Sequence, residues 1–292
     1  MSEHPKFHLP VMLPVRPVAT STACLVATLS SRWGLLAILS GLALCLGLEQ
    51  AWAQQDMAAF SIWEAIVKWT PLIFWGTGQG LGGFVLNIWV SVLAMTIGTC
   101  LGLMLGIGQV SPHRVLRWPS WAVTQLFRNS PWLVLLFYFM MLLPYEIRIL
   151  GFSVPFSGWF KATVALSLPV MANISEIVRG AILSIPTGQW ESAESLALTR
   201  RQTMWRIILP QCVKRMIPPW MNWYCILVMS TPLISILGVQ DAMTLTQDAL
   251  AAEGRMELLI PFYLWLMLWF FAYTYPIARW TRRLESRFAV KL

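Results

Sequence analysis

The stretch that decides the fold is G-G-F-V-L-N-I-W-V-S-V-L-A-M-T-I-G-T-C-L-G-L-M-L-G-I-G, residues 82–108. It contains no Asp, Glu, Lys or Arg, and it exceeds the roughly 20 apolar residues that a helix needs to cross a bilayer. Only helices and closed barrels satisfy their backbone groups in lipid, and this stretch lacks the alternation of a barrel strand. We therefore predict that it is a membrane-spanning helix.

Similar apolar runs recur along the chain and predict six spans. They lie near residues 33–50, 82–108, 122–143, 158–183, 218–238 and 258–279. The composition agrees, because 57% of the 292 residues are hydrophobic and 12% are charged, whereas soluble domains carry about 25% charged residues. The sequence therefore predicts an all-α polytopic membrane protein and argues against a soluble or disordered chain.

The basic residues are distributed unevenly between the segments that connect these spans. Of the 21 Lys and Arg residues, 17 lie in residues 1–32, 111–128, 176–215 and 279–292. Because basic connecting segments stay in the cytoplasm, this pattern places residues 176–215 inside and residues 241–257 outside. The net charge of +8 thus reflects membrane topology, and we expect no nucleic-acid partner.

The N-terminal region allows two interpretations. The apolar run at 33–48 is followed by Ala51-Trp52-Ala53, a small-residue pattern typical of a signal-peptide cleavage site. Residues 1–53 are therefore either an extension with a retained first helix or one with a cleaved signal. If the helix is retained, both termini are cytoplasmic.

The rest of the chain divides into three parts. Residues 54–80 form a periplasmic or interfacial segment, in which apolar residues at helical spacing predict an interfacial helix within 58–75. Residues 81–285 form the transmembrane domain, and residues 286–292 form a cytoplasmic tail.

The sequence lacks the motifs of common enzymes. It has no H-E-x-x-H, no G-x-S-x-G and no Walker A, since no Lys follows a Gly anywhere in the chain. The five cysteines have spacings that fit neither a disulfide framework nor a zinc site. We therefore expect no enzymatic activity, no cofactor and no metal.

Three glycines recur at every fourth position of the first quoted stretch, at Gly98, Gly102 and Gly106. Small residues at this spacing let two membrane helices approach each other closely. We predict that this stripe is a packing surface.

The longest predicted cytoplasmic connection has a helical pattern of its own. Pro186 ends the preceding helix and Thr187 can cap a new one. One face of that helix carries Trp190, Ala193, Leu196 and Ala197. Thr199 and Gln202 have the spacing of a capping box, which predicts a second short helix. The pattern by itself leaves open whether these helices dock in a partner's groove or form a solvated connector.

The same segment is similar to a known family. Residues 176–211, E-I-V-R-G-A-I-L-S-I-P-T-G-Q-W-E-S-A-E-S-L-A-L-T-R-R-Q-T-M-W-R-I-I-L-P-Q, resemble the cytoplasmic loop of bacterial ABC-transporter permeases of the polar amino acid family. The family's E-A-A signature falls on Glu191, Ser192 and Ala193. R-N-S-P at 128–131 and S-T-P-L-I-S-I-L-G-V at 230–239 resemble two further motifs, so the similarity covers about residues 80–285.

Two positions depart from the family pattern. Ala197 stands where the family has a glycine, which matters only if that residue has positive φ. We expect the turn to start at Thr199, where alanine at 197 is harmless. Met229 and Ser230 stand where relatives often have Lys followed by Asp or Asn, so residues that bear on substrate preference differ here.

The resemblance implies an ABC importer permease fold with five core transmembrane helices, in the bacterial inner membrane. Such a permease forms the translocation pathway for polar amino acids or related compounds. Its implied partners are ABC ATPase subunits, a periplasmic substrate-binding protein, a second permease of the same or a paralogous kind, and membrane lipid. The alternatives are a non-ABC multi-span transporter and a membrane assembly protein.

The resemblance also implies that the loop at 184–211 couples the permease to the ATPases. The implied coupling residues are Trp190, Glu191, Ser192, Ala193, Leu196 and Ala197, with the apolar ones supplying contact surface. For Glu191 the alternative is an acid favoured in the first turn by the helix dipole.

Ionisable residues within a membrane bundle are functional candidates. Glu176 and Arg179 are spaced to pair along one helix, which leaves both structural pairing and a pathway role open. With Glu176, the candidate substrate-pathway residues are Asn173, Ser230 and Thr231. We expect Arg128 to be an anchor at the inner interface.

Overall fold

The computed structural model describes residues 62–78, 80–144, 146–149 and 152–288. The chain divides into two units, Met1–Ala59 and Phe60–Leu292, and all of the described residues belong to the second. The predicted first helix or signal at 33–50 lies outside the described residues.

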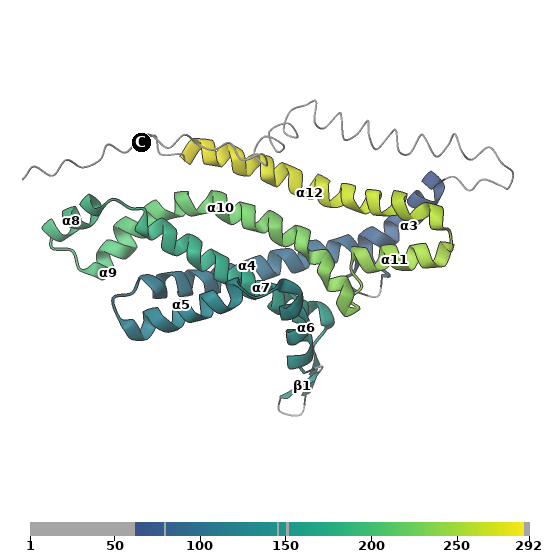
Figure 1. Ribbon diagram of the computed structural model, residues 1–292, viewed down its shortest axis with the longest axis horizontal. Helices are drawn as coiled ribbons and strands as arrows, with labels where there is room; N and C mark the ends of the chain where they lie inside the picture. Colours follow the sequence, from purple (N-terminus) through teal and green to yellow (C-terminus); the bar gives the residue numbers. More distant parts are fainter. Residues whose placement is uncertain (1–61, 79, 145, 150–151, 289–292) are drawn as a thin grey trace, which may run out of the picture. The chain divides into compact units, whose positions relative to one another are not determined.

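The described part is a helical bundle (Figure 1). Its α-helices are α3 (Ile62–Trp75), α4 (Gly83–Val110), α5 (Arg114–Arg128), α6 (Trp132–Leu142), α7 (Gly158–Leu183), α8 (Thr187–Ser195), α9 (Arg200–Thr203), α10 (Leu209–Ser230), α11 (Ala242–Glu253) and α12 (Leu259–Phe288). A π-helical turn, Met204–Ile208, joins α9 to α10, and 3-10 helices cover Thr231–Leu237 and Met256–Leu258. The predicted all-α class is confirmed. Strands β1 (Glu146–Ile149) and β2 (Phe152–Pro155) add an antiparallel hairpin that pairs Glu146 with Pro155.

Four described helical stretches are long and apolar enough to cross a membrane. They are Gly83–Val110, Gly158–Leu183, Arg200–Leu237 and Met256–Ser286. Each contains, or nearly coincides with, a span predicted from the sequence. The helix predicted within 58–75 is also present, as α3. On α3, Lys68 forms an ion pair of 2.7 Å with Glu253 of α11, and Trp69 donates to the same carboxylate at 2.6 Å.

The predicted span at 122–143 is wrong as a single helix. It divides into the end of α5 and the short apolar α6, because Pro131 lacks an N–H group and restricts the residue before it. The side chains of Asn129 and Ser130 bond to the carbonyls of Gln125 and Leu126, at 2.7 and 2.6 Å, which satisfies the end of α5. α6 is about 16 Å long, so it does not cross the membrane alone.

The centre of the bundle is a parallel contact between α4 and α7 (Figure 1). A Cβ atom at Gly98 would lie 2.6 Å from Val170 Cγ1, and one at Gly102 would lie 2.8 Å from Ile174 Cβ. Gly106 faces Val178 in the same way. Each glycine faces a β-branched residue of α7, and these residues, like the glycines, recur at every fourth position. The two helices therefore interlock. The predicted packing stripe is confirmed.

A buried polar network fixes the other end of α4. Asn87 donates to the Thr231 hydroxyl and to the Asp241 carboxylate, both at 3.1 Å, and accepts the Ala242 N–H at 3.0 Å. Asp241 also accepts the Thr244 N–H at 2.9 Å and so caps α11. Burial raises the pKa of the Asp241 carboxyl, and its hydrogen bonds oppose that rise. This network ties α4, α10 and α11 together.

We predict that Gly102→Ala destabilises the protein. The added Cβ would lie 2.8 Å from the Met171 carbonyl oxygen, and a backbone atom cannot move aside, so overpacking lowers the free energy of unfolding by about 1–3 kcal/mol. Thermal unfolding of the purified chain measures this loss.

The matched control is Gly180→Ala on α7. No heavy atom lies within 4 Å of a Cβ there, so higher helix propensity stabilises this variant by about 1 kcal/mol. Equal unfolding temperatures for the two variants would show that the stripe does not set the helix contact.

Candidate functional site

The predicted coupling loop is a structured turn between two short helices. α8 ends at Ser195, and Ala197 follows with a φ of +54°. The Ala197 N–H donates to the Glu194 carbonyl at 2.9 Å, and the Leu198 N–H donates to the Ala193 carbonyl at 3.1 Å. These two bonds are those of a Schellman motif, which places a left-handed residue after the helix.

The expectation for Ala197 is therefore wrong. The turn begins at 197 rather than at Thr199, and alanine adopts a conformation that glycine adopts more readily. The capping box is confirmed: the Gln202 N–H donates to the Thr199 hydroxyl at 3.3 Å, and the Thr199 N–H donates to the Gln202 side chain at 2.9 Å. The loop is thus held at both of its helix ends.

The coupling candidates face in two directions. Ala193 is 1% exposed and Trp190 is half-buried against the core, so these two point toward the chain's own bundle. Leu196 is 72% exposed, and Glu191 and Ser192 are also exposed. The expectation that Ala193 supplies docking surface is wrong, because this residue packs inward with Trp190 one helical turn away. The exposed residues form the outer face of the loop.

The loop is also bonded to the helix that follows it. Arg215 on α10 donates to the carbonyl and hydroxyl oxygens of Ser184, both at 2.7 Å. These hydrogen bonds join the end of α7, where the loop begins, to α10.

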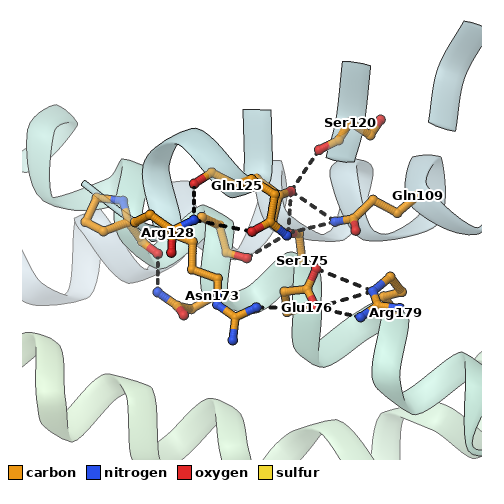
Figure 2. Close-up of polar contacts among 12 residues, drawn as sticks. Gln109, Ser120, Gln125, Arg128, Asn173, Ser175, Glu176 and Arg179 are labelled. Carbon is orange, nitrogen blue, oxygen red and sulfur yellow. Dashed lines mark hydrogen bonds and ion pairs between the residues drawn. The ribbon is translucent and has the colours of Figure 1, made fainter. Parts of the chain in front are cut away.

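A charged centre lies on α7, about two helical turns before this loop begins. Glu176 binds Arg179 at 2.8 Å and lies 3.6 Å from the guanidinium of Arg128 on α5. Figure 2 shows the carboxylate between the two arginines. The Glu176 side chain is 15% exposed, whereas those of Arg128 and Arg179 are 46% and 40% exposed. The centre thus has one unneutralised positive charge and remains accessible.

A polar cluster beside it joins three helices (Figure 2). Gln109 of α4 donates to Thr124 of α5 at 3.0 Å and to Ser175 of α7 at 3.1 Å. Both hydroxyls also bond to backbone carbonyls on their own helices. Within the described residues the buried Gln109 Oε1 has no hydrogen-bond partner.

The candidate pathway residues are not gathered in one place. Asn173 lies one turn before Glu176 and donates to the Pro169 carbonyl at 2.8 Å. Arg215 of α10 contacts Ser184 at the end of α7, so this contact is a common reference point for the two helices. Glu176 lies about 12 Å from it along α7, whereas Ser230 lies about 22 Å from it along α10. Ser230 is partly buried, while Thr231 is fully buried in the Asn87 network.

Sequence reasoning missed several residues of these clusters. Gln109, Thr124, Asn87 and Asp241 are polar residues that meet only after distant helices pack. Arg128 lies at the C-terminal end of α5 beside Glu176, and its expected place at the inner interface stays a prediction. The available signal was the proline at 131, which marks where α5 ends.

The described part is thus a bundle of membrane-length helices with a partly exposed charged centre and a hydrogen-bonded loop at one end. Among the described residues, no group of three or more His, Cys, Asp or Glu side chains is placed to hold a metal ion. Residues 98–287 match the model of the binding-protein-dependent transport system inner membrane component. The chain belongs to this family of multi-pass inner-membrane permeases.

Curated relatives agree with this assignment. The chain is 33% identical to the L-cystine transport system permease protein TcyB of Bacillus subtilis (strain 168), over 61% of this chain and 74% of that protein. It is 32% identical to the probable amino-acid ABC transporter permease protein YckA of the same strain, over 78% and 96%. It is 31% identical to the histidine/lysine/arginine/ornithine transport system permease protein HisM of Escherichia coli (strain K12), over 63% and 79%.

Solved structures show the same fold. A chain from the crystal structure of an amino acid ABC transporter with histidines superposes with a TM-score of 0.60 at 23% identity, covering 75% of this chain and 97% of that one. A chain of the inward-facing MetNI methionine ABC transporter superposes with a TM-score of 0.55 at 17% identity, over 76% and 98%. The importer permease fold is therefore confirmed.

We predict that Ala197→Gly stabilises the coupling loop. Glycine removes the steric penalty of positive φ, which is about 1 kcal/mol, so the Leu198 amide, which donates to Ala193, exchanges its hydrogen about fivefold more slowly. Hydrogen exchange with mass spectrometry of the loop peptide measures this effect.

Ala251→Gly is the matched control, because Ala251 is exposed within the right-handed helix α11. Glycine there costs about 1 kcal/mol in helix propensity, so local exchange becomes faster. Faster exchange of Leu198 in Ala197→Gly would contradict the prediction.

Proposed function

We propose that this chain is the permease subunit of an ABC importer and forms the translocation pathway for polar amino acids or close relatives. The observation that carries the proposal is the family match over residues 98–287, together with relatives named for the transport of cystine, glutamine and histidine/lysine/arginine/ornithine. The absence of a Walker A motif from the sequence fits a subunit that is energised by separate ATPases.

The charged centre suits the head group that all α-amino acids share. A zwitterion presents an ammonium and a carboxylate on one carbon. Glu176 offers an acceptor for the ammonium, and the half-exposed Arg128 offers a donor for the carboxylate. Asn173, one turn away on α7, adds an amide within the same region. Charge-assisted hydrogen bonds of this kind are stronger than neutral ones.

The candidate pathway residues Ser230 and Thr231 have different roles in this proposal. Ser230 is partly buried at the end of α10, and its hydroxyl donates to the Ile226 carbonyl, so its oxygen remains an acceptor for a polar solute. Thr231 is fully buried and accepts a hydrogen bond from Asn87. We assign it to positioning the helix ends rather than to contact with substrate.

The exposed face of α8 is the proposed contact with an ATPase subunit. Glu191 and Ser192 offer polar contacts, and Leu196 offers an apolar side chain that the bundle leaves uncovered. The inward residues Trp190 and Ala193, and Ala197 at the turn, hold this face in place. The Arg215 contact with Ser184 then passes loop movement to α7, which carries Glu176.

The remaining partners follow from this arrangement. The excess of Lys and Arg in residues 111–128 and 176–215 supports a cytoplasmic position for the loop and a periplasmic position for α11. A substrate-binding protein then delivers substrate at the α11 end. A second permease, identical or paralogous, completes the pathway.

We predict that Glu176→Gln impairs transport. The amide lacks the charge that holds an ammonium, and a hydrogen bond to a charged group contributes about 1.5–3 kcal/mol, so uptake efficiency falls about 10-fold or more. The measurement is uptake of a panel of labelled amino acids into vesicles that contain this chain, its ATPase and its binding protein.

The control is Glu257→Gln, because Glu257 is 76% exposed and lies outside the bundle centre. The amount of folded transporter is measured in parallel, since loss of the Arg179 pair also affects stability. Parent-like uptake by folded Glu176→Gln protein would exclude a pathway role for this residue.

We predict that Leu196→Arg uncouples the permease. Leu196 is exposed, so the variant inserts and folds, but a charge placed in the ATPase contact is unfavourable unless it reaches water. Each 1.4 kcal/mol lost there weakens the association about tenfold. Co-purification of the ATPase and transport are expected to fall together.

Leu196→Met is the matched control, because it keeps an apolar side chain of similar size. Ala193→Arg is unsuitable, since Ala193 is buried and the variant would disrupt the loop itself. If Leu196→Arg retains both its ATPase and the parent transport rate, the outer face of α8 is not the docking surface.

A further inference from the structure

A pocket of about 650 Å³ lies beside the first turns of α5 and shares Arg179 with the charged centre. Its lining residues are Gln109, Arg114, Arg117, Trp118, Trp121 and Arg179. They come from α4, α5 and α7, so the pocket exists only where these three helices meet. The function proposed above does not use it.

The pocket is strongly positive. Three of its six lining residues are arginines and none is acidic. Within the described part of the chain, neither Arg114 nor Arg117 takes part in an ion pair, and Arg179 binds only Glu176. Arg114 is also the first residue of α5, whose first turn contains no acid, so the helix dipole adds to the positive field. Such a site favours an anion.

Gln109 also lines the pocket, and its side chain takes part in hydrogen bonds with the neighbouring helices. Its amide nitrogen is bound to Thr124 and Ser175, and its buried Oε1 has no donor among the described residues. A buried acceptor without a donor is unfavourable. This oxygen is enclosed within the protein, so the arginines are the polar groups that are open to an occupant.

The surroundings favour a lipid over a free anion. α5 exposes large apolar side chains, which are Val115, Leu116, Trp118, Trp121 and Leu126. Trp118 is 69% exposed and Trp121 is 50% exposed, and both also line the pocket. Tryptophan is typical of the boundary between headgroups and acyl chains. Arg114 and Arg117 lie at the start of α5 beside these apolar side chains, so a phosphate held by the arginines would leave its acyl chains next to Trp118 and Trp121.

We propose that this pocket binds the headgroup of an anionic phospholipid of the phosphatidylglycerol type. The phosphate contacts Arg114, Arg117 and Arg179, and the acyl chains lie along the tryptophan face of α5. The inference needs only the geometry of α4, α5 and α7 and does not depend on which substrate is transported.

The test is a lipid titration of the full chain in phosphatidylcholine nanodiscs, read by native mass spectrometry. Added phosphatidylglycerol is expected to remain bound to the parent protein in preference to phosphatidylcholine. Arg114→Gln/Arg117→Gln is expected to lose about 30-fold in affinity, since each basic residue near an anionic lipid contributes about fivefold. The matched control, Arg282→Gln/Arg283→Gln on α12, removes two arginines that do not line the pocket and is expected to bind like the parent.

Three results would overturn the proposal. The first is equal binding of phosphatidylglycerol by the parent and the Arg114/Arg117 double variant. The second is displacement of the lipid by inorganic phosphate at matched concentration, which would make the pocket a site for free anions. The third is efficient disulfide cross-linking between two copies carrying Trp118→Cys, with the native cysteines replaced, which would show that a second permease covers this face. Failure of phosphate to displace the lipid, with no cross-link, supports the lipid site.

Discussion

Three glycines on α4 place its backbone against the side chains of α7, and the other helices are positioned by that contact. Gly98, Gly102 and Gly106 each face a β-branched residue, and any added Cβ would lie under 3 Å from an atom of α7. Because lipid tails are as apolar as the side chains, moving an apolar side chain from lipid into a helix contact gives little hydrophobic free energy. Close van der Waals packing of this kind therefore holds the helices together. The contact also sets the register of the two helices, because the glycines and their partners both recur every four residues.

The polar cluster at Gln109 follows from this register, and a second polar cluster holds the other end of α4. At one end Gln109 of α4 comes level with Ser175 of α7, and α5 adds Thr124 to complete the cluster. Gly108 assists, because it lets Ser120 of α5 approach α4 closely. At the other end Asn87 bonds to Thr231 and Asp241. Polar groups within a membrane need partners, so these clusters admit little sliding of one helix along another.

The charged centre and the loop are linked by the same helices. Glu176 lies one residue after Ser175, so the cluster that locates Ser175 also locates the carboxylate between Arg128 and Arg179. Two turns further on, α7 ends at Ser184, where Arg215 ties it to α10. A displacement of α8 therefore reaches the charged centre through about 12 Å of helix. This short rigid path is the physical basis for coupling in the proposed mechanism.

Local sequence by itself determined the class of fold, four of the membrane spans, the glycine stripe and the capping box at Thr199. Each of these depends on neighbours along the chain: a run without charges must lie in lipid as a helix, and a four-residue repeat marks one helix face. Only the tertiary structure showed that the predicted span at 122–143 is broken at Pro131, that Ala193 faces the bundle, that Ala197 has positive φ, and that Arg128 meets Glu176. The break at Pro131 has a local cause in the proline itself. The other features depend on contacts between residues distant in the sequence, or on how the turn after α8 must bend, and helical periodicity predicts neither.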